Sequence, residues 1–214
     1  MEYPKNITTA AEAILAKLPR CPRTVLILEH GMEALSDMVG QPLVMPFAEI
    51  PGAEEIPGEL VFGLINGRLT CALCAHGQDA VVPVQLFAAM GVRTMLMVGA
   101  AQAVNPRYRD GDLVLLCSHV DTAGNRSAIL YQTELMQDIK ELAAFAATPL
   151  WEGVYGSAGS DADVAGDGLM PGALAALEQE KEVIALCGVA SDESALDKIH
   201  VKLRRLLREM MMYL

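Results

Sequence analysis

The 214-residue chain contains no uninterrupted apolar run of about 18 residues, which is the length that a membrane-spanning helix needs. Its first residues, Met1-Glu2-Tyr3-Pro4-Lys5, lack the charged and then apolar order of a secretory signal peptide. Hydrophobic residues nevertheless make up 52% of the sequence. We therefore expect a cytoplasmic protein with a large buried core and no contact with a membrane.

Positive charge is also scarce. The 16 Lys and Arg residues face 27 Asp and Glu residues, which gives a formal net charge of −11. Such a balance repels nucleic acid, whose binding depends on neutralising phosphates with basic side chains. The one basic cluster, Lys202, Arg204 and Arg205, falls on an expected helix, where a solvated face explains it. The sequence predicts no nucleic-acid partner.

The five cysteines are an odd number, and four of them lie inside apolar runs, which favours reduced, buried thiols over a disulfide framework. Cys71 and Cys74 form a CxxC pattern within a strand-like run. Residues three apart on a strand point to opposite faces, so this pair cannot share a metal ion. The sequence predicts no metal site and no cofactor.

Apolar runs alternate along the chain with segments of helical periodicity. Asn66-Gly67 between two apolar runs predicts a tight β-hairpin. Runs without polar alternation predict strands buried on both faces. The expected strands span 24–28, 93–98, 112–117, 153–155 and 182–190, and the main expected helices span 81–90, 134–147 and a final one from about 194 to 214. This order predicts one α/β domain over residues 1–214, with helices on both faces of the sheet.

Two further local patterns lie in the first quarter of the chain. Thr9 to Glu12 has the spacing of a capping box at a helix start, and 42–58, with four prolines, indicates an extended loop. Sheets of this class place ligands beyond the strand ends. We therefore expect the functional residues to follow Leu28, Cys74, Val98, Tyr155 and Ala190.

Near those strand ends lie four distinctive stretches: Glu59 to Arg68, Gly91 to Val98 with Ala100-Ala101, Asn105-Pro106 with Gly111-Asp112, and Glu152 to Tyr155 with Ala158-Gly159. In these stretches, and in their order, the sequence resembles the trimeric purine nucleoside phosphorylases. The resemblance covers about Thr24 to His200 and implies a mixed central sheet flanked by helices on both faces. It also implies transfer of a ribosyl group from a purine nucleoside to phosphate, without a cofactor, and a homo-oligomer, specifically a trimer.

The chain departs from this family where the family binds phosphate. His30 stands in place of a serine and follows Glu29, whose carboxylate would repel phosphate if it pointed inward. His76 and Gln78 stand where the family has an arginine and a histidine, and Ala100 could still present its backbone N–H. The resemblance makes His30, His76, Gln78 and Ala100 the candidates for binding phosphate or another anion.

The nucleoside-binding positions are altered as well. Asp163 aligns with the glutamate that reads the purine, and Ser191 with an asparagine that reads the base. Tyr155 is retained, and His200 aligns with a histidine near the ribose 5′ position. The loop near Gly124, which in the family completes a neighbouring subunit's site, is shorter. Tyr155, Asp163, Ser191 and His200 are therefore the nucleoside-binding candidates.

Two classes of function remain open from the sequence. In the first, the protein is a nucleoside phosphorylase of weak activity, or a nucleosidase that uses water because phosphate is no longer held. His30 and His76 would then bind an anion, hold a metal or transfer protons. In the second, the pocket binds a nucleoside, base or anion without reaction, or the fold serves only a structural role, and the histidines are partly exposed remnants.

Overall fold

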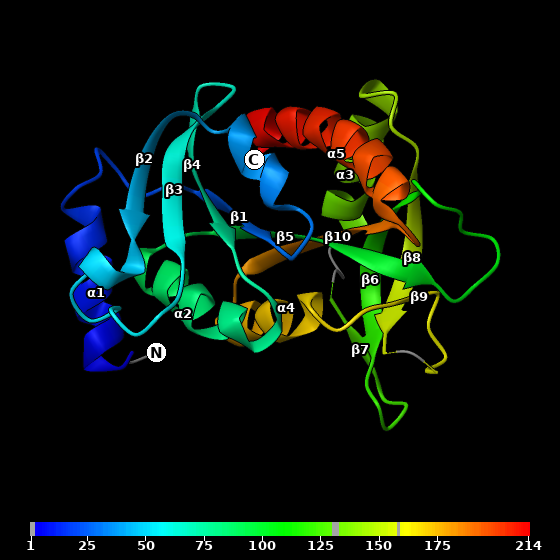
Figure 1. The fold of residues 1–214 in the computed structure, drawn as a ribbon, viewed down its shortest axis with the longest axis horizontal. Coiled ribbons are helices and arrows are strands. Elements are labelled where there is room, and N and C mark those ends of the chain that lie inside the picture. Colours follow the sequence, from blue (N-terminus) through cyan, green and yellow to red (C-terminus); the bar gives the residue numbers. More distant parts are fainter. Residues whose placement is uncertain (1–2, 130–132, 158) are drawn as a thin grey trace.

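The computed structural model describes residues 3–129, 133–157 and 159–214. One mixed β-sheet runs through the molecule, with α1, α2 and α4 on one face and α3 and α5 on the other (Figure 1). The helices are α1 (Lys5–Leu15), α2 (Val81–Met90), α3 (Thr133–Phe145), α4 (Leu169–Glu178) and α5 (Glu193–Tyr213), with short 3-10 turns η1 (Glu33–Met38), η2 (Phe47–Glu49) and η3 (Gly77–Ala80). The expected α/β class, with helices on both faces of a mixed sheet, is confirmed.

The strands form two connected parts. Their bounds are β1 (Thr24–Leu28), β2 (Gly40–Pro46), β3 (Glu59–Ile65), β4 (Arg68–Cys74), β5 (Thr94–Ala103), β6 (Leu113–Val120), β7 (Arg126–Ala128), β8 (Leu150–Gly156), β9 (Val164–Ala165) and β10 (Glu182–Val189). Strands β4, β1, β5 and β10 are parallel neighbours, so their carboxyl ends meet at one edge. Beyond them β10, β6, β8 and β9 pair in turn and return to β5, which curls this half of the sheet into a ring.

Each face of the sheet has its own hydrophobic core. Because successive side chains of a strand alternate between faces, Val25 and Ile27 of β1 pack with α1, α2 and α4. Leu26 and Leu28 of the same strand pack with α3 and α5. All four side chains are at most 3% exposed. Burial on both faces is the reason that β1 is uniformly apolar, and it makes the strand a rigid support for the residue that follows it.

The sequence-based expectations for the hairpin and for α2 are confirmed. Asn66 and Gly67 join β3 to β4 with φ values of 49° and 76°, the left-handed pair that a tight hairpin needs. Gly91 ends α2 with φ 92°. On β4, Cys71 is buried and Cys74 is exposed, as expected for opposite faces, and all five cysteines are free thiols.

Two local expectations are wrong. Thr9 does not cap α1, which begins at Lys5; its hydroxyl donates instead to the Lys5 carbonyl, 2.9 Å away, inside the helix. Part of the expected loop 42–58 is the edge strand β2, where Pro42 lies in a register shift that leaves its missing N–H without consequence. Helix α5 begins at Glu193, close to the expected start near residue 194, and Asp192 caps it by accepting the Ala195 N–H at 2.8 Å.

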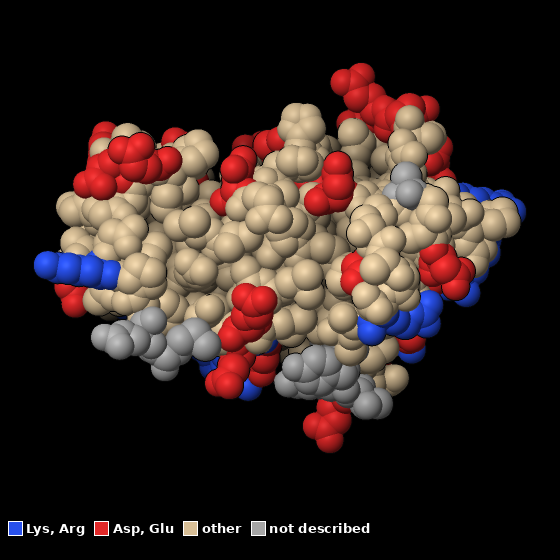
Figure 2. Space-filling view, turned by 90° about the horizontal axis from the view of Figure 1, so that it is seen from below, with Lys and Arg blue, Asp and Glu red and all other residues tan. Residues whose placement is uncertain are grey.

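Within the described residues, no helix is long and apolar enough to cross a membrane. Figure 2 shows acidic side chains scattered over one face of the molecule, with Lys and Arg toward its ends. That face offers nucleic acid no continuous basic surface, in agreement with the net charge of −11.

Candidate functional site

The carboxyl edge of the parallel strands positions the segment that follows β1. The Glu29 N–H donates to the Val98 carbonyl of β5 at 2.8 Å, and the Ala75 N–H donates to the Leu28 carbonyl at 2.9 Å. These bonds extend the strand pairing by one residue on each side of Leu28. Glu29 and His76 are therefore held close together although 47 positions separate them in the sequence.

A pocket of about 230 Å³ opens at this edge. It is lined by Leu28, His30, Glu33, Pro57, Gly58, Leu73, Cys74, Ala75, His76, Asp79 and Pro83. The fold thus brings His30 and His76 to one pocket. His30 is exposed, and its Nδ1 lies 3.1 Å from the Glu33 carboxylate. Among the described residues, this pocket is lined by two histidines and two carboxylates but by no lysine or arginine.

Glu29 lies behind His76 and is buried. Its Oε1 is 3.3 Å from Nδ1 of His76, whose side chain is half exposed toward the pocket. Its Oε2 has no hydrogen-bond partner among the described residues, and the residue is 7% exposed. Burial, and then the charge of Asp167, raise the pKa of Glu29 to about 7. The carboxyl group therefore changes charge near neutral pH.

Two glycines make room for this side chain. A Cβ at Gly168 would overlap the Glu29 carboxyl group, and a Cβ at Gly99 would overlap its Oε2 and press against Leu169. The glutamate points inward, which is the orientation that opposes phosphate binding.

We expect Gly168→Ala to destabilise the protein by about 1–3 kcal/mol, the usual cost of forcing an extra methyl group into a packed site. Gly168 has φ −89°, which alanine adopts freely, so the cost arises from contact with Glu29 and not from backbone strain. The free energy of unfolding in urea measures it. The double variant with Glu29→Ala should recover most of the loss, and an equal loss in both backgrounds would contradict the contact.

The remaining candidates differ in how they reach this site. The Tyr155 side chain is 1% exposed, and its hydroxyl lacks a partner in the described part of the chain. Burial, and then the charge of Glu29, raise the Tyr155 pKa. Ala100 is half-buried on β5, and Gln78 is exposed on η3, outside the residues that line the pocket.

Asp163, Ser191 and His200 are engaged in hydrogen bonds within the protein. The Asp163 carboxylate accepts from the Asn105 amide and from the Val154 N–H, both at 3.0 Å. The Ser191 N–H and hydroxyl both donate to the Asp110 carboxylate. Nε2 of His200 lies 2.7 Å from the Gly31 carbonyl. These contacts tie loops together, and a direct role for the three side chains in nucleoside binding stays a prediction.

Glu29 and Asp167 were not among the site residues predicted from the sequence. The available signal was a single carboxylate placed directly after an apolar strand, at a position where ligands bind in this sheet class. Ligand atoms of Glu29, His76 and Asp167 lie within 4.8 Å of one another. Imidazole and carboxylate together could hold a divalent cation there. The sequence left a metal open at His30 and His76 but did not indicate Glu29 or Asp167 as ligands.

Comparison with known proteins agrees with the fold. The profile of the Phosphorylase superfamily matches residues 23–160. Purine nucleoside phosphorylase 1 of Geobacillus stearothermophilus is 28% identical over 178 residues, which cover 70% of this chain and 65% of that protein. The Bacillus subtilis protein of the same name is 26% identical over 179 residues, which cover 70% and 66%. The match therefore spans less than two thirds of these relatives' length.

Among solved structures, isoform 2 of purine nucleoside phosphorylase from Schistosoma mansoni, in complex with cytosine and ribose-1-phosphate, superposes with a TM-score of 0.84. The superposition covers 98% of this chain and 96% of that one. At 19% identity this similarity concerns the fold alone. Because the family profile covers well over half of the sequence, the chain belongs to the phosphorylase superfamily.

Proposed function

We propose that the protein binds purine nucleosides as a purine nucleoside phosphorylase-like protein, that ribosyl transfer to phosphate is weak or lost, and that water replaces phosphate as the attacking group. The main observation behind this proposal is that acidic side chains, and no basic ones apart from histidine, surround the pocket at His76. Glu33 and Asp79 line it, Glu29 lies behind it, and no lysine or arginine lines it in the described part of the chain. Phosphate oxygens need charged or fixed donors in a pocket, and carboxylates repel them.

The Glu29–His76 pair supports proton transfer from water. An ionised Glu29 accepts a hydrogen bond from Nδ1 of His76 and so directs the other ring nitrogen, Nε2, as a proton acceptor. The water oxygen forms a bond to the anomeric carbon while the bond from that carbon to the base nitrogen breaks. His76 takes the water proton, and the base leaves with the bonding electron pair and gains a proton from solvent. The products are ribose and the free base, and no cofactor is needed.

Base release with and without phosphate tests this proposal. We expect purified protein to release free base from a purine nucleoside at a rate that added phosphate does not change, with ribose as the sugar product. Chromatography of the base and a reducing-sugar assay measure the two products. Acceleration by phosphate together with formation of ribose-1-phosphate would show instead that His30 and His76 replace the missing phosphate donors.

A non-catalytic binding module is the second candidate, and the internal bonds of Asp163, Ser191 and His200 favour it. Side chains already bonded to the protein are less free to follow a reacting nucleoside. A rise in melting temperature with a purine nucleoside, without any base release, would support this candidate. Ligand at about 100 times its Kd adds roughly 2.7 kcal/mol to the free energy of unfolding.

Assembly and location are part of the same proposal. The family resemblance supports a homo-oligomer, specifically a trimer, and the five free thiols support a reducing, cytoplasmic setting. If two subunits share a site, the loop around Gly124 is the segment to examine, because it is short compared with the loop that completes the neighbouring site in the family. Light scattering of the purified protein would determine the number of subunits.

A further inference from the structure

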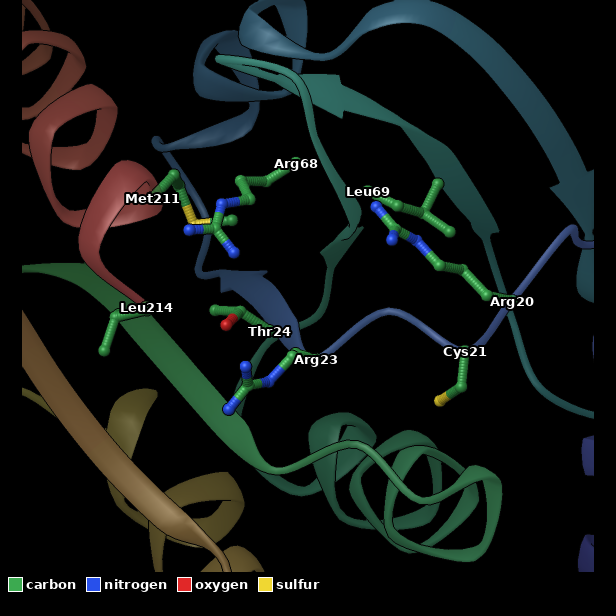
Figure 3. A pocket seen from close by; sticks show the side chains of 8 residues that line it. All are labelled: Arg20, Cys21, Arg23, Thr24, Arg68, Leu69, Met211 and Leu214. Atoms are coloured by element: carbon green, nitrogen blue, oxygen red, sulfur yellow. The ribbon is translucent and has the colours of Figure 1, made fainter.

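A second cavity, of about 130 Å³, lies at the opposite edge of the sheet from His76. It is formed where the parallel strands β1 and β4 begin and where α5 ends. Figure 3 shows its lining residues, which are Arg20, Cys21, Arg23, Thr24, Arg68, Leu69, Met211 and Leu214. We call it the arginine pocket. A single water needs roughly 10–15 Å³ measured in this way, so the arginine pocket has room for a small polyatomic ligand.

None of the ion pairs formed by the described residues involves the three arginines of the arginine pocket. Three of the 16 Lys and Arg residues line it, in a chain of net charge −11. The ion pairs among the described residues involve other arginines, a lysine and two histidines. Arg68 donates one bond to the Met212 carbonyl at 3.1 Å, which leaves further guanidinium donors free. An anionic ligand would provide the missing charge.

Glu182, an acidic side chain on which the charge of Arg23 acts, is already engaged by other partners. Burial raises the pKa of Glu182, but hydrogen bonds from Arg93 and Thr94 and, to a smaller extent, the charge of Arg23 lower it below its usual value. The Glu182 carboxylate accepts from Arg93 and from the Thr94 hydroxyl, each at 2.8 Å. Glu182 therefore does not neutralise Arg23 through a direct pair.

Thr24 adds a second, independent sign of a ligand. The residue is 3% exposed, and its hydroxyl has no hydrogen-bond partner in the described ranges. Figure 3 shows the Thr24 side chain between Arg23 and Arg68 at the pocket. A buried hydroxyl without a partner costs roughly 1–3 kcal/mol relative to a bonded one. An oxyanion in the arginine pocket would accept a hydrogen bond from the Thr24 hydroxyl and remove that cost.

We propose that the arginine pocket binds a phosphate group or a similar tetrahedral oxyanion. The planar fork of a guanidinium group presents two parallel donors that fit the oxygens of such an ion. The cavity accommodates the phosphate group itself. The source is therefore either free phosphate or a larger molecule whose remainder stays outside. The arginine pocket is at the other edge of the sheet from His76, so it does not depend on the function proposed above.

Titration calorimetry with inorganic phosphate at low ionic strength tests the proposal, because salt screens exposed arginines. We expect binding to the wild-type protein, weakened about tenfold by Arg20→Gln and about tenfold by Arg68→Gln, the effect of losing one charged hydrogen bond. Arg126→Gln, an exposed arginine on β7, is the matched control and should bind normally. His76→Ala should also bind normally.

Thr24→Val gives a variant that keeps the shape of the side chain and the three arginines. It should weaken phosphate binding several-fold without lowering the melting temperature. Ribose 5-phosphate in place of phosphate distinguishes the sources: tighter binding through the same arginines assigns the arginine pocket to a larger phosphorylated ligand. Absence of binding, or binding that survives both arginine changes and disappears in His76→Ala, would overturn the proposal.

Discussion

Replacing His76 with alanine is expected to lower base release from purine nucleosides by a factor of about 10²–10⁴, the usual contribution of a positioned general base. His76 is the imidazole that faces the pocket while a buried carboxylate holds its Nδ1 at 3.3 Å. The measurement is single-turnover release of free base at enzyme concentrations high enough to detect a slow catalyst.

His119→Ala is the matched control for this substitution. His119 lies on β6 and does not line the pocket, so its loss should leave base release unchanged. Melting temperatures of both variants separate loss of chemistry from loss of fold. If His76→Ala released base as fast as the wild type, the assignment of proton transfer to His76 would be wrong, whether or not phosphate takes part in the reaction.

Glu29→Gln is expected to make the protein more stable than the wild type at pH 8, and to remove a pH dependence of stability. The pKa of Glu29 is about 7 in the folded protein, against 4.5 for an unperturbed group. Between these values the unfolded chain releases a proton that the folded protein retains, so wild-type stability falls as pH rises. The loss of wild-type stability that this pKa difference causes reaches about 3 kcal/mol above pH 7 and is absent below pH 4.5.

The free energy of unfolding in urea at pH 5 and pH 8 measures this effect, in a chelating buffer so that no cation binds the carboxylates. Glu55→Gln, an exposed carboxylate, is the control and should follow the wild type at both pH values. Base release gives an independent readout of Glu29 as a positioning residue. In the wild type the rate should rise as Glu29 ionises, and Glu29→Gln should lose that limb of the pH profile. If the free energy of unfolding depended on pH in the same way for the wild type and for Glu29→Gln, Glu29 would not be a buried carboxyl group with a raised pKa.

The elements that the sequence predicted well are those set by the backbone preferences or the hydrophobicity of residues close together in the chain. Asn66-Gly67 specifies a hairpin because few residue pairs accept two positive φ angles, and uniformly apolar runs specify strands buried on both faces. The misplaced elements have weaker local signals. Thr9 has the spacing of a helix cap, but the residues before it are already helical, so its hydroxyl bonds inside the helix. Strand β2 depends on hydrogen bonds to β3, which the local sequence of β2 does not reveal.

The sequence by itself determined the α/β class, the family resemblance and the strand ends at which a site had to form. These depend on periodicity and on residues close together in the chain. Only the tertiary structure decided that Glu29 points inward, that His76 contacts it and that two glycines leave the necessary space. Only the fold likewise gathers Arg20, Arg23 and Arg68 beside an unpartnered Thr24. Such contacts join segments far apart in sequence, and the direction of a side chain depends on what packs around it.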